Sequence, residues 1–381
     1  MSSIALNETF KLVDVPADTF TVETGPFDRQ QWREIIERFE DANLMQAWPY
    51  AATRWGAENL SHTVLLKNGE VVAAAQAVIK KVPILGSGLA HVKRGPLWQL
   101  RGTQRDPEIL RQMIRALHGV YAVRKGLLLR VFPGCIEEID LLRSTFTEEG
   151  FVRNFSIGVP RTVILDLSYS LEELRSSLKP TWRRNLVLAE RHNLTIHHGT
   201  SDKLFEAFSR LYVELLDRKK IGGVVDIEHY KEMQKTLSPG LKMRVMLCEY
   251  GGEYVAGIVV PYVGNTAQNL LAATGDKGLA LRGSYILQWR MLEWLKNNGC
   301  RWYDLDAVNH DLYPGISQFK MGFAGKLGWE VEYPGQFESC TNAFSQSSVK
   351  VGEWLLKTYG DTQVALKRFQ TRRSNHANNG D

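Results

Sequence analysis

Two stretches of the chain, far apart in the sequence, repeat one pattern. Residues 64–79 read VLLKNGEVVAAAQAVI, and residues 245–263 read VMLCEYGGEYVAGIVVPYV. Each has an apolar run, a turn that ends in Gly-Glu, and a second apolar run with small residues. The dipeptides Asn-Gly and Gly-Gly tolerate positive φ angles, so both stretches are predicted β-hairpins. Glu70 and Glu253 hold the same place in the two patterns, an offset of 253 − 70 = 183 residues.

The parallel continues beyond the hairpins. The first is followed by a predicted helix over 107–126 and a buried strand, LLLRVFP. The second is followed by a strand, NLLAATG, a helix over 284–299 that ends at a glycine, and the strand CRWYDLDAV. This order predicts a duplicated α/β (α+β) domain, each copy a mixed sheet flanked by helices. The alternative is a single domain whose two hairpins are alike by chance.

We therefore predict three regions. An N-terminal domain spans 1–160, a C-terminal domain spans 161–340, and a helix with a polar tail spans 341–381. A length of 381 residues suits two domains of ordinary size. Between the halves, Ser168 or Ser170 is expected to cap one helix, and Pro180 to begin the next.

Composition indicates a globular protein of the cytoplasm. Hydrophobic residues make up 44% and charged residues 23% of the chain. No apolar run approaches the roughly 20 residues of a membrane span, and the acidic N-terminus does not read as a secretory signal. The four cysteines form no CxxC pair, which fits a reducing compartment and predicts no metal site. The net charge of +5 favours an anionic partner, although many cytosolic proteins are equally basic.

Lys320 stands in the most unusual setting among the basic residues. It lies between Phe319 and Phe323, with Gly315, Gly322 and Gly325 nearby. Glycines permit close backbone approach, so backbone N–H groups and this cation together could hold an anion or a developing oxyanion. The alternative is a lysine on a final helix whose apolar stem lies along the sheet.

Three further basic sites are candidates, each with a structural alternative. Arg218 ends an amphipathic helix, where a cation also complements the helix dipole. Arg183 and Arg184 follow Trp182 and could contact phosphate or a base, or simply form a solvated helix face. Arg54 lies in an aromatic-rich segment that could equally be a helix packed under a sheet. Loops typical of nucleotide hydrolases, nucleophile elbows and zinc-protease motifs are absent from the sequence.

Taken in order, several segments resemble the Fem-type peptidyltransferases and the related FemAB-like acyltransferases. The segments are LMQAWPYAATRW, VKRGPLW, KPTWRRNLVLAERHNL, LYVELLDRKK, AATGDKGLALRGSYILQWRMLEWLKNNGCRWYDL and ISQFKMGFAGK, within residues 40–335. The resemblance implies two tandem GNAT-like (acyl-CoA N-acyltransferase-like) domains. It also implies transfer of an amino acid from aminoacyl-tRNA to the stem-peptide amine of a cell-wall precursor; other relatives are thought to move different acyl groups.

The resemblance also assigns residues and partners. Arg54 matches a family position where lysine is usual, Arg218 matches the arginine that ends a long helix, and Lys320 matches the lysine of an FK-x-G-F motif. It implies that a pocket grips the diphosphate of a nucleotide- or lipid-linked precursor, with charged tRNA as a partner and the inner membrane surface as a peripheral contact. No permanently bound cofactor is expected, and the cofactor-binding residues stay unassigned.

The chain also departs from the family. The usual DLGG after the last long strand reads DLDAV, so Asp306 and Ala307 replace glycines. No long helical arm is visible, and GDKGLALRGS keeps only a trace of the loop that holds coenzyme A in simple acetyltransferases. Two alternatives therefore stay open: an acyl-CoA-dependent N-acyltransferase of polysaccharide synthesis, and a non-catalytic RNA- or envelope-binding protein. For the transferase, a substrate carboxylate, Asp304 or Asp306 could accept the amine proton, and Asp304 fits a structural acid better.

Overall fold

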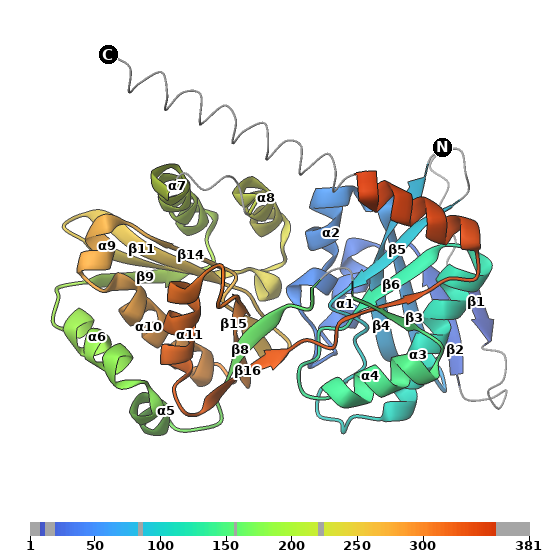
Figure 1. Ribbon diagram of the computed structural model, residues 1–381, viewed down its shortest axis with the longest axis horizontal. Helices are drawn as coiled ribbons and strands as arrows, with labels where there is room; N and C mark the ends of the chain where they lie inside the picture. The colour runs from blue at the N-terminus through green and yellow to red at the C-terminus, as the bar shows by residue number, and fades with distance from the viewer. Residues whose placement is uncertain (1–7, 12–19, 83–86, 156–157, 220–224, 356–381) are drawn as a thin grey trace, which may run out of the picture.

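The computed structural model describes residues 8–11, 20–82, 87–155, 158–219 and 225–355, and shows two α/β halves side by side (Figure 1). The first half is built on an eight-stranded sheet in the order β1-β2-β3-β4-β5-β6-β17-β7. Its strands are β1 (Glu8–Lys11), β2 (Phe20–Gly25), β3 (Leu60–Lys67), β4 (Glu70–Val82), β5 (Ser87–Lys93), β6 (Leu128–Phe132), β17 (Gln336–Ser339) and β7 (Val152–Asn154). All neighbours are antiparallel except β5 and β6.

The second half carries two sheets. One has four strands, in the order β14 (Leu271–Thr274), β11 (Glu253–Val260), β10 (Arg244–Tyr250) and β9 (Thr195–Gly199). The other has five, in the order β12 (Tyr262–Val263), β13 (Thr266–Gln268), β15 (Trp302–Val308), β8 (Arg161–Asp166) and β16 (Gly328–Glu332). Here β13 and β15 are the parallel pair.

Helices surround the sheets of both halves. The first half has α1 (Arg29–Ile36), α2 (Trp48–Trp55), α3 (Pro107–Leu117), which continues as a π-helical stretch over His118–Arg124, and α4 (Ile139–Glu148). The second has α5 (Leu171–Ser177), α6 (Pro180–Glu190), α7 (Asp202–Lys219), α8 (Ile227–Thr236), α9 (Asp276–Ala280), α10 (Gly283–Asn297) and α11 (Pro314–Ala324). No helix within the described ranges is both long enough and apolar enough to span a membrane.

The predicted hairpins and caps are confirmed. Asn68 and Gly69 have φ angles of 53° and 83°, and Gly251 and Gly252 have 61° and 82°, as turns between paired strands require. Ser170 caps α5 through a capping box with Glu173. Pro180 is the first residue of α6, where its missing N–H costs no helical hydrogen bond.

The duplication is confirmed by topology, because both halves place their elements in one order. In each, a hairpin and a third strand are followed by a helix (α3 or α10) and a strand (β6 or β15). A short helix (α4 or α11) and an edge strand (β7 or β16) come next. In both halves, one further strand lies between the last two of these strands, β17 between β6 and β7 and β8 between β15 and β16.

That inserted strand comes from the other half in each case. β8 follows β7 directly in the chain but pairs with β15 and β16, whereas β17 follows β16 directly but pairs with β6 and β7. The predicted boundary after residue 160 falls just before β8. The range 161–340, however, includes β17, which belongs to the sheet of the first half. By the order of the repeated elements, each half therefore contributes one strand to the sheet of the other.

A shared core also joins the halves. One cluster of buried side chains includes Trp32 and Ile36 of α1 together with Phe208 of α7 and Met233 of α8. In the predicted C-terminal region, residues 343–355 are helical and pack on the first sheet, with Val349 against Leu89 and Leu128. The remainder of the predicted polar tail, 356–381, lies outside the described residues.

Candidate active site

A β-bulge in β15 organises the junction between the two halves. The pairing of β15 with β8 shifts register between Asp304 and Ala307. Asp306, inside the bulge, has a left-handed backbone with φ 66°, and its N–H donates to Asp304 Oδ1 at 2.7 Å. Bulges change the direction of side chains, and this one places the carboxylates of Asp304 and Asp306 in different environments.

Asp304 is buried and fully engaged, with an exposed fraction of 5%. Its Oδ1 also accepts a hydrogen bond from Thr162 Oγ1 on β8, and its Oδ2 accepts one from the hydroxyl of Tyr333, just after β16. Burial, and then the negative charge of Asp306, raise the pKa of Asp304. These contacts tie three strands together, which supports a structural role for this acid.

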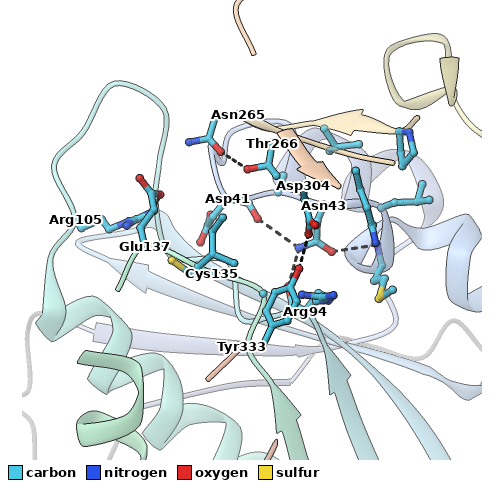
Figure 2. Close-up of a pocket in the computed structure, with 18 residues that line it drawn as sticks. Asp41, Asn43, Arg94, Arg105, Cys135, Glu137, Asn265, Thr266, Asp304 and Tyr333 are labelled. Atoms are coloured by element: carbon cyan, nitrogen blue, oxygen red, sulfur yellow. Dashed lines mark hydrogen bonds and ion pairs between the residues drawn. The ribbon is translucent and has the colours of Figure 1, made fainter. Parts of the chain in front are cut away.

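Arg94, from the first half, lies against the same group of side chains. It follows β5 with a φ of 53°, and its guanidinium carbon lies 3.7 Å from the centre of the Tyr333 ring. Burial works to lower the pKa of Arg94, but its interactions with Tyr333 and Asp304 outweigh burial, and the net shift is upward. Asn43 Nδ2 donates to the Arg94 carbonyl at 2.7 Å and fixes the backbone there (Figure 2).

A small cavity of about 70 Å³ lies behind this group, between the halves (Figure 2). Polar side chains line it, among them Asp41, Arg105 and Asn265. Asp41 accepts hydrogen bonds from the backbone N–H groups of Trp98 and Gln99, while burial raises its pKa to about 7. Ligand pockets usually measure roughly 300–1,000 Å³, so this space suits a few waters rather than a substrate.

Lys320 lies on the outer side of the bulge. Its Nζ donates to the carbonyl of Ala307 at 2.8 Å, so α11 holds the ammonium at the bulge. Burial lowers the pKa of Lys320, against the opposing charges of Asp306 and Asp304. Within the described chain it forms no ion pair. The structure therefore presents a half-buried cation, held by a backbone carbonyl and close to two acids.

The glycines around Lys320 serve packing, so our expectation that they admit a substrate anion is wrong for two of the three. A Cβ on Gly322 would lie 2.9 Å from Cδ1 of Trp182, which packs on α11. A Cβ on Gly325, whose φ is 64°, would lie 2.2 Å from the carbonyl oxygen of Ser177. Only open space surrounds Gly315. Phe319 and Phe323 likewise pack against Trp182.

A cluster of cations surrounds one indole in the first half. Relative to the ring of Trp55, Arg54 Cζ lies 5.3 Å away, Lys80 Nζ 5.7 Å and Lys93 Nζ 4.5 Å. Arg54 and Trp55 end α2, whereas Lys80 and Lys93 come from β4 and β5. We call Arg54, Lys80 and Lys93 the cation cluster.

The cation cluster is short of negative charge. Burial, followed by the charges of Lys80 and Arg54, lowers the pKa of Lys93 to about 8. Burial and the charges of Arg130 and Arg54 also lower the pKa of Lys80, with Glu353 opposing. No carboxylate among the described residues forms an ion pair with any of the three. Mutually repelling, partly desolvated cations of this kind are an attractive site for an anion.

Tyr230 of α8 links the cation cluster and the β15 bulge electrostatically. Its side chain is buried, and burial raises its pKa. The charge of Asp306 acts in the same direction, whereas the charge of Arg54 opposes it. Thr53 Oγ1 of α2 lies 3.2 Å from His229 Nδ1 of α8, which fixes α2 against the second half. One tyrosine thus lies within electrostatic reach of both sites.

The remaining predicted residues lie apart from these two sites or outside the described side chains. Arg183 and Arg184 are exposed on α6 and are not part of the cation cluster. Figure 1 shows α6 on the outer side of the second half, well away from α2. The side chain of Arg218, near the end of α7, lies outside the described residues. Lys80, Lys93 and Arg94 were missed, because basic residues on a strand or just after one normally face solvent.

Comparison with known proteins relates the fold of this chain to that of solved structures. Residues 242–348, which include β15 and Lys320, match the model of the FemAB family. The crystal structure of FemX superposes with a TM-score of 0.70 at 15% identity, covering 84% of this chain and 98% of that one. The C-terminal domain of a putative lysylphosphatidylglycerol synthetase from Agrobacterium fabrum gives 0.51 at 14% identity, covering 84% and 93%.

A further structure, a conserved protein of unknown function from Bacteroides thetaiotaomicron, gives a TM-score of 0.52 at 8% identity over 83% of this chain and 98% of that one. No curated protein matches in sequence. At such identities the structural likeness concerns the fold. Residues 242–348 thus match the FemAB family, and the chain as a whole has a FemX-like fold with two α/β halves in tandem.

Proposed function

We propose that the protein transfers an activated acyl or aminoacyl group to a primary amine of a phosphate-bearing cell-envelope precursor, such as a peptidoglycan stem peptide. The observation that carries this proposal is the cation cluster, which forms no ion pair with a described carboxylate and lies on the half opposite to Lys320 and the β15 bulge. A fold with an anion site on one half and, on the other, an ammonium that can stabilise an oxyanion suits acyl transfer to a phosphate-bearing acceptor.

The residues would divide the work between them. Arg54, Lys80 and Lys93, with Arg218 as a further candidate, would bind the acceptor's diphosphate, arginine being suited to bidentate contacts. Lys320 would stabilise the oxyanion that forms when the amine attacks the acyl carbonyl. A C–N bond forms and the bond from the carbonyl carbon to the ester oxygen or thioester sulfur breaks. The amine loses a proton and the leaving group departs as an alcohol or thiol.

Aminoacyl-tRNA is the donor we place first, and acyl-CoA second. The basic residues of α9 and of the turn before α10 are already engaged. Lys277 pairs with Glu253, and Arg282 Nη1 donates to the carbonyl of Leu279 at 2.9 Å. They are therefore less available for the phosphates of coenzyme A. No permanently bound cofactor enters this scheme.

The test supplies both donors and both kinds of acceptor. The protein is incubated with aminoacyl-tRNA or acyl-CoA labelled in the acyl group, and with a nucleotide-linked or a lipid-linked stem-peptide precursor. Label in the acceptor identifies the donor, and the two precursors distinguish the sources of the diphosphate. Binding of RNA or precursor with no transfer from either donor would refute the proposal in favour of a non-catalytic binding protein.

A further inference from the structure

Asp306 has a left-handed backbone conformation, which is energetically unfavourable for a residue that carries a Cβ. Its φ of 66° is left-handed, which costs an L-residue with a Cβ roughly 1–2 kcal/mol and a glycine almost nothing. The penalty is somewhat smaller for asparagine and aspartate, and Asn68 at φ 53° shows the ordinary use of this conformation in an exposed hairpin turn. Asp306 instead lies in a bulge at the junction of the two halves. Outliers at such places often serve function.

The carboxylate of Asp306 is only partly engaged. Its Oδ1 accepts a hydrogen bond from Gln268 Nε2 at 3.1 Å. In the part of the chain that the structure describes, Oδ2 accepts none and the carboxylate forms no ion pair. The neighbouring Asp304, by contrast, has both oxygens bonded within the protein. Of the two acids at the bulge, Asp306 is therefore the one with an oxygen to offer to a ligand.

Charges of opposite sign lie on the two halves. Three cations gather around Trp55 on the first half, and Asp306 supplies negative charge on the second, next to the ammonium that Ala307 holds. A phosphate is attracted to the cation cluster and repelled by the carboxylate. A protonated amine is repelled by the cation cluster and attracted by the carboxylate, and the Lys320 ammonium opposes part of this attraction. Complementarity of this kind orients a ligand that carries both groups.

We infer that Asp306 forms the amine-binding subsite of the protein, with Oδ2 accepting an N–H of the acceptor's primary ammonium beside Lys320. The inference rests on the proposed function, which it deepens by placing the two ends of the acceptor. The phosphate end lies on the cation cluster, and the amine end lies at the bulge. The strained backbone at Asp306 is the cost of holding a carboxylate at this position.

The test uses a minimal primary amine, N-α-acetyl-lysine methylamide, as the probe. Its binding to the full chain is measured by saturation-transfer NMR for the wild type, Asp306→Gly, Asp306→Asn and Asn68→Gly. Asn68→Gly is the matched control, because it relieves the same backbone conformation away from the junction. We expect the wild type and Asn68→Gly to bind alike and both Asp306 variants to bind at least tenfold more weakly. The uncharged probe N-α-acetyl-norleucine methylamide should show no such difference.

Stability separates this role from a structural one. Asp306→Gly should melt at or above the wild-type temperature, because glycine adopts the left-handed conformation without strain. Unchanged amine binding by Asp306→Gly, or no saturable binding by the wild type, overturns the subsite. If the wild type binds the amine but transfers no acyl group, the proposed function fails and the subsite stands. If transfer proceeds with an unchanged KM for the amine in Asp306→Gly, the function stands and the subsite fails.

Discussion

The strands β6 and β15 occupy the same place in the two halves but carry opposite buried charges. Arg130 is the third residue of β6, and Asp304 is the third residue of β15. Arg130 pairs with Glu338 on the exchanged strand β17 and with Glu353 of the helical residues 343–355. Asp304 is held by Thr162 on the exchanged strand β8 and by Tyr333, whose groups are neutral hydroxyls. Arg130 is thus paired with carboxylates, whereas the hydrogen-bond donors to Asp304 are neutral.

The two halves also differ in the helix that comes after each of these strands. β6 pairs with β17 in a continuous register, and the next helix, α4, carries a buried threonine, Thr145, as its seventh residue. β15 is bulged, and the seventh residue of α11 is Lys320. We conclude that duplication supplied one scaffold twice. In the function we propose, the second copy acts on the reacting groups and the first contributes the cation cluster.

The largest effect is expected at Lys320. Lys320→Ala removes the cation that the second half has and the first lacks, so turnover should fall at least tenfold. Loss of a comparable oxyanion donor typically costs about 3–4 kcal/mol of transition-state stabilisation. The melting temperature should stay near that of the wild type. Steady-state kinetics with Lys326→Ala, an exposed lysine on the same segment, provide the control, and a folded Lys320→Ala variant with full activity would falsify this role.

The two helices α4 and α11 end in matched glycines that differ in their surroundings. Gly325 has φ 64° and a Cβ there would meet the Ser177 carbonyl at 2.2 Å, whereas Gly150 has φ 78° and open space. Gly325→Ala should therefore destabilise by about 3 kcal/mol and Gly150→Ala by about 1 kcal/mol. Urea unfolding measures both. Equal losses would mean that the packing of α11 on α5 is not what requires glycine.

Tyr333→Phe tests the neutral partners of Asp304. Removal of the hydroxyl leaves a buried carboxylate oxygen without its donor, so unfolding should become easier by about 2 kcal/mol. Tyr313→Phe changes an exposed tyrosine and should stay within about 0.5 kcal/mol. Denaturant unfolding of the two variants at one pH decides the matter. If Tyr333→Phe leaves the free energy of unfolding unchanged, Asp304 has found another hydrogen-bond donor.

Lys93→Met tests the cation cluster through opposite effects on stability and binding. Because burial and like charges lower the pKa of Lys93 to about 8, its charged form opposes folding at neutral pH. The variant should be more stable at pH 7 by on the order of 1 kcal/mol, after allowance for solvent screening. Yet it should bind the phosphate-bearing acceptor more weakly.

The gain in stability expected for Lys93→Met should depend on pH in a definite direction. Between pH 8 and the ordinary lysine pKa of 10.5, the unfolded wild type binds more protons than the folded one, so wild-type stability rises with pH. The advantage of Lys93→Met should therefore shrink as pH rises through this window. Melting curves at pH 7 and pH 10 measure it. A constant difference would contradict a strained charge at Lys93.

Local features of this fold could be predicted from the sequence, and long-range pairing could not. Asn68-Gly69 and the capping box at Ser170 are specified by neighbouring residues. The four residues of β17 carry no local signal of whether they pair with β6 or with β15, so the exchange of strands was invisible. The motif around Lys320 was evident, but Lys80 and Lys93 lie on separate strands and gather only when β4 and β5 meet α2. The left-handed φ of Asp306 was not predicted, although the glycine usual at this position in the family was a signal of it.

The most direct measurement of the division between the halves is a comparison of single-turnover transfer rates at saturating acceptor. Arg54→Ala weakens the anion site, so excess acceptor should restore its rate to within about threefold of the wild type. Lys320→Ala lacks a group that acts on the reacting carbonyl, so its rate should stay at least tenfold low at every acceptor concentration. A Lys320→Ala enzyme that reaches the wild-type rate at saturation, or an Arg54→Ala enzyme that never recovers, would contradict the account.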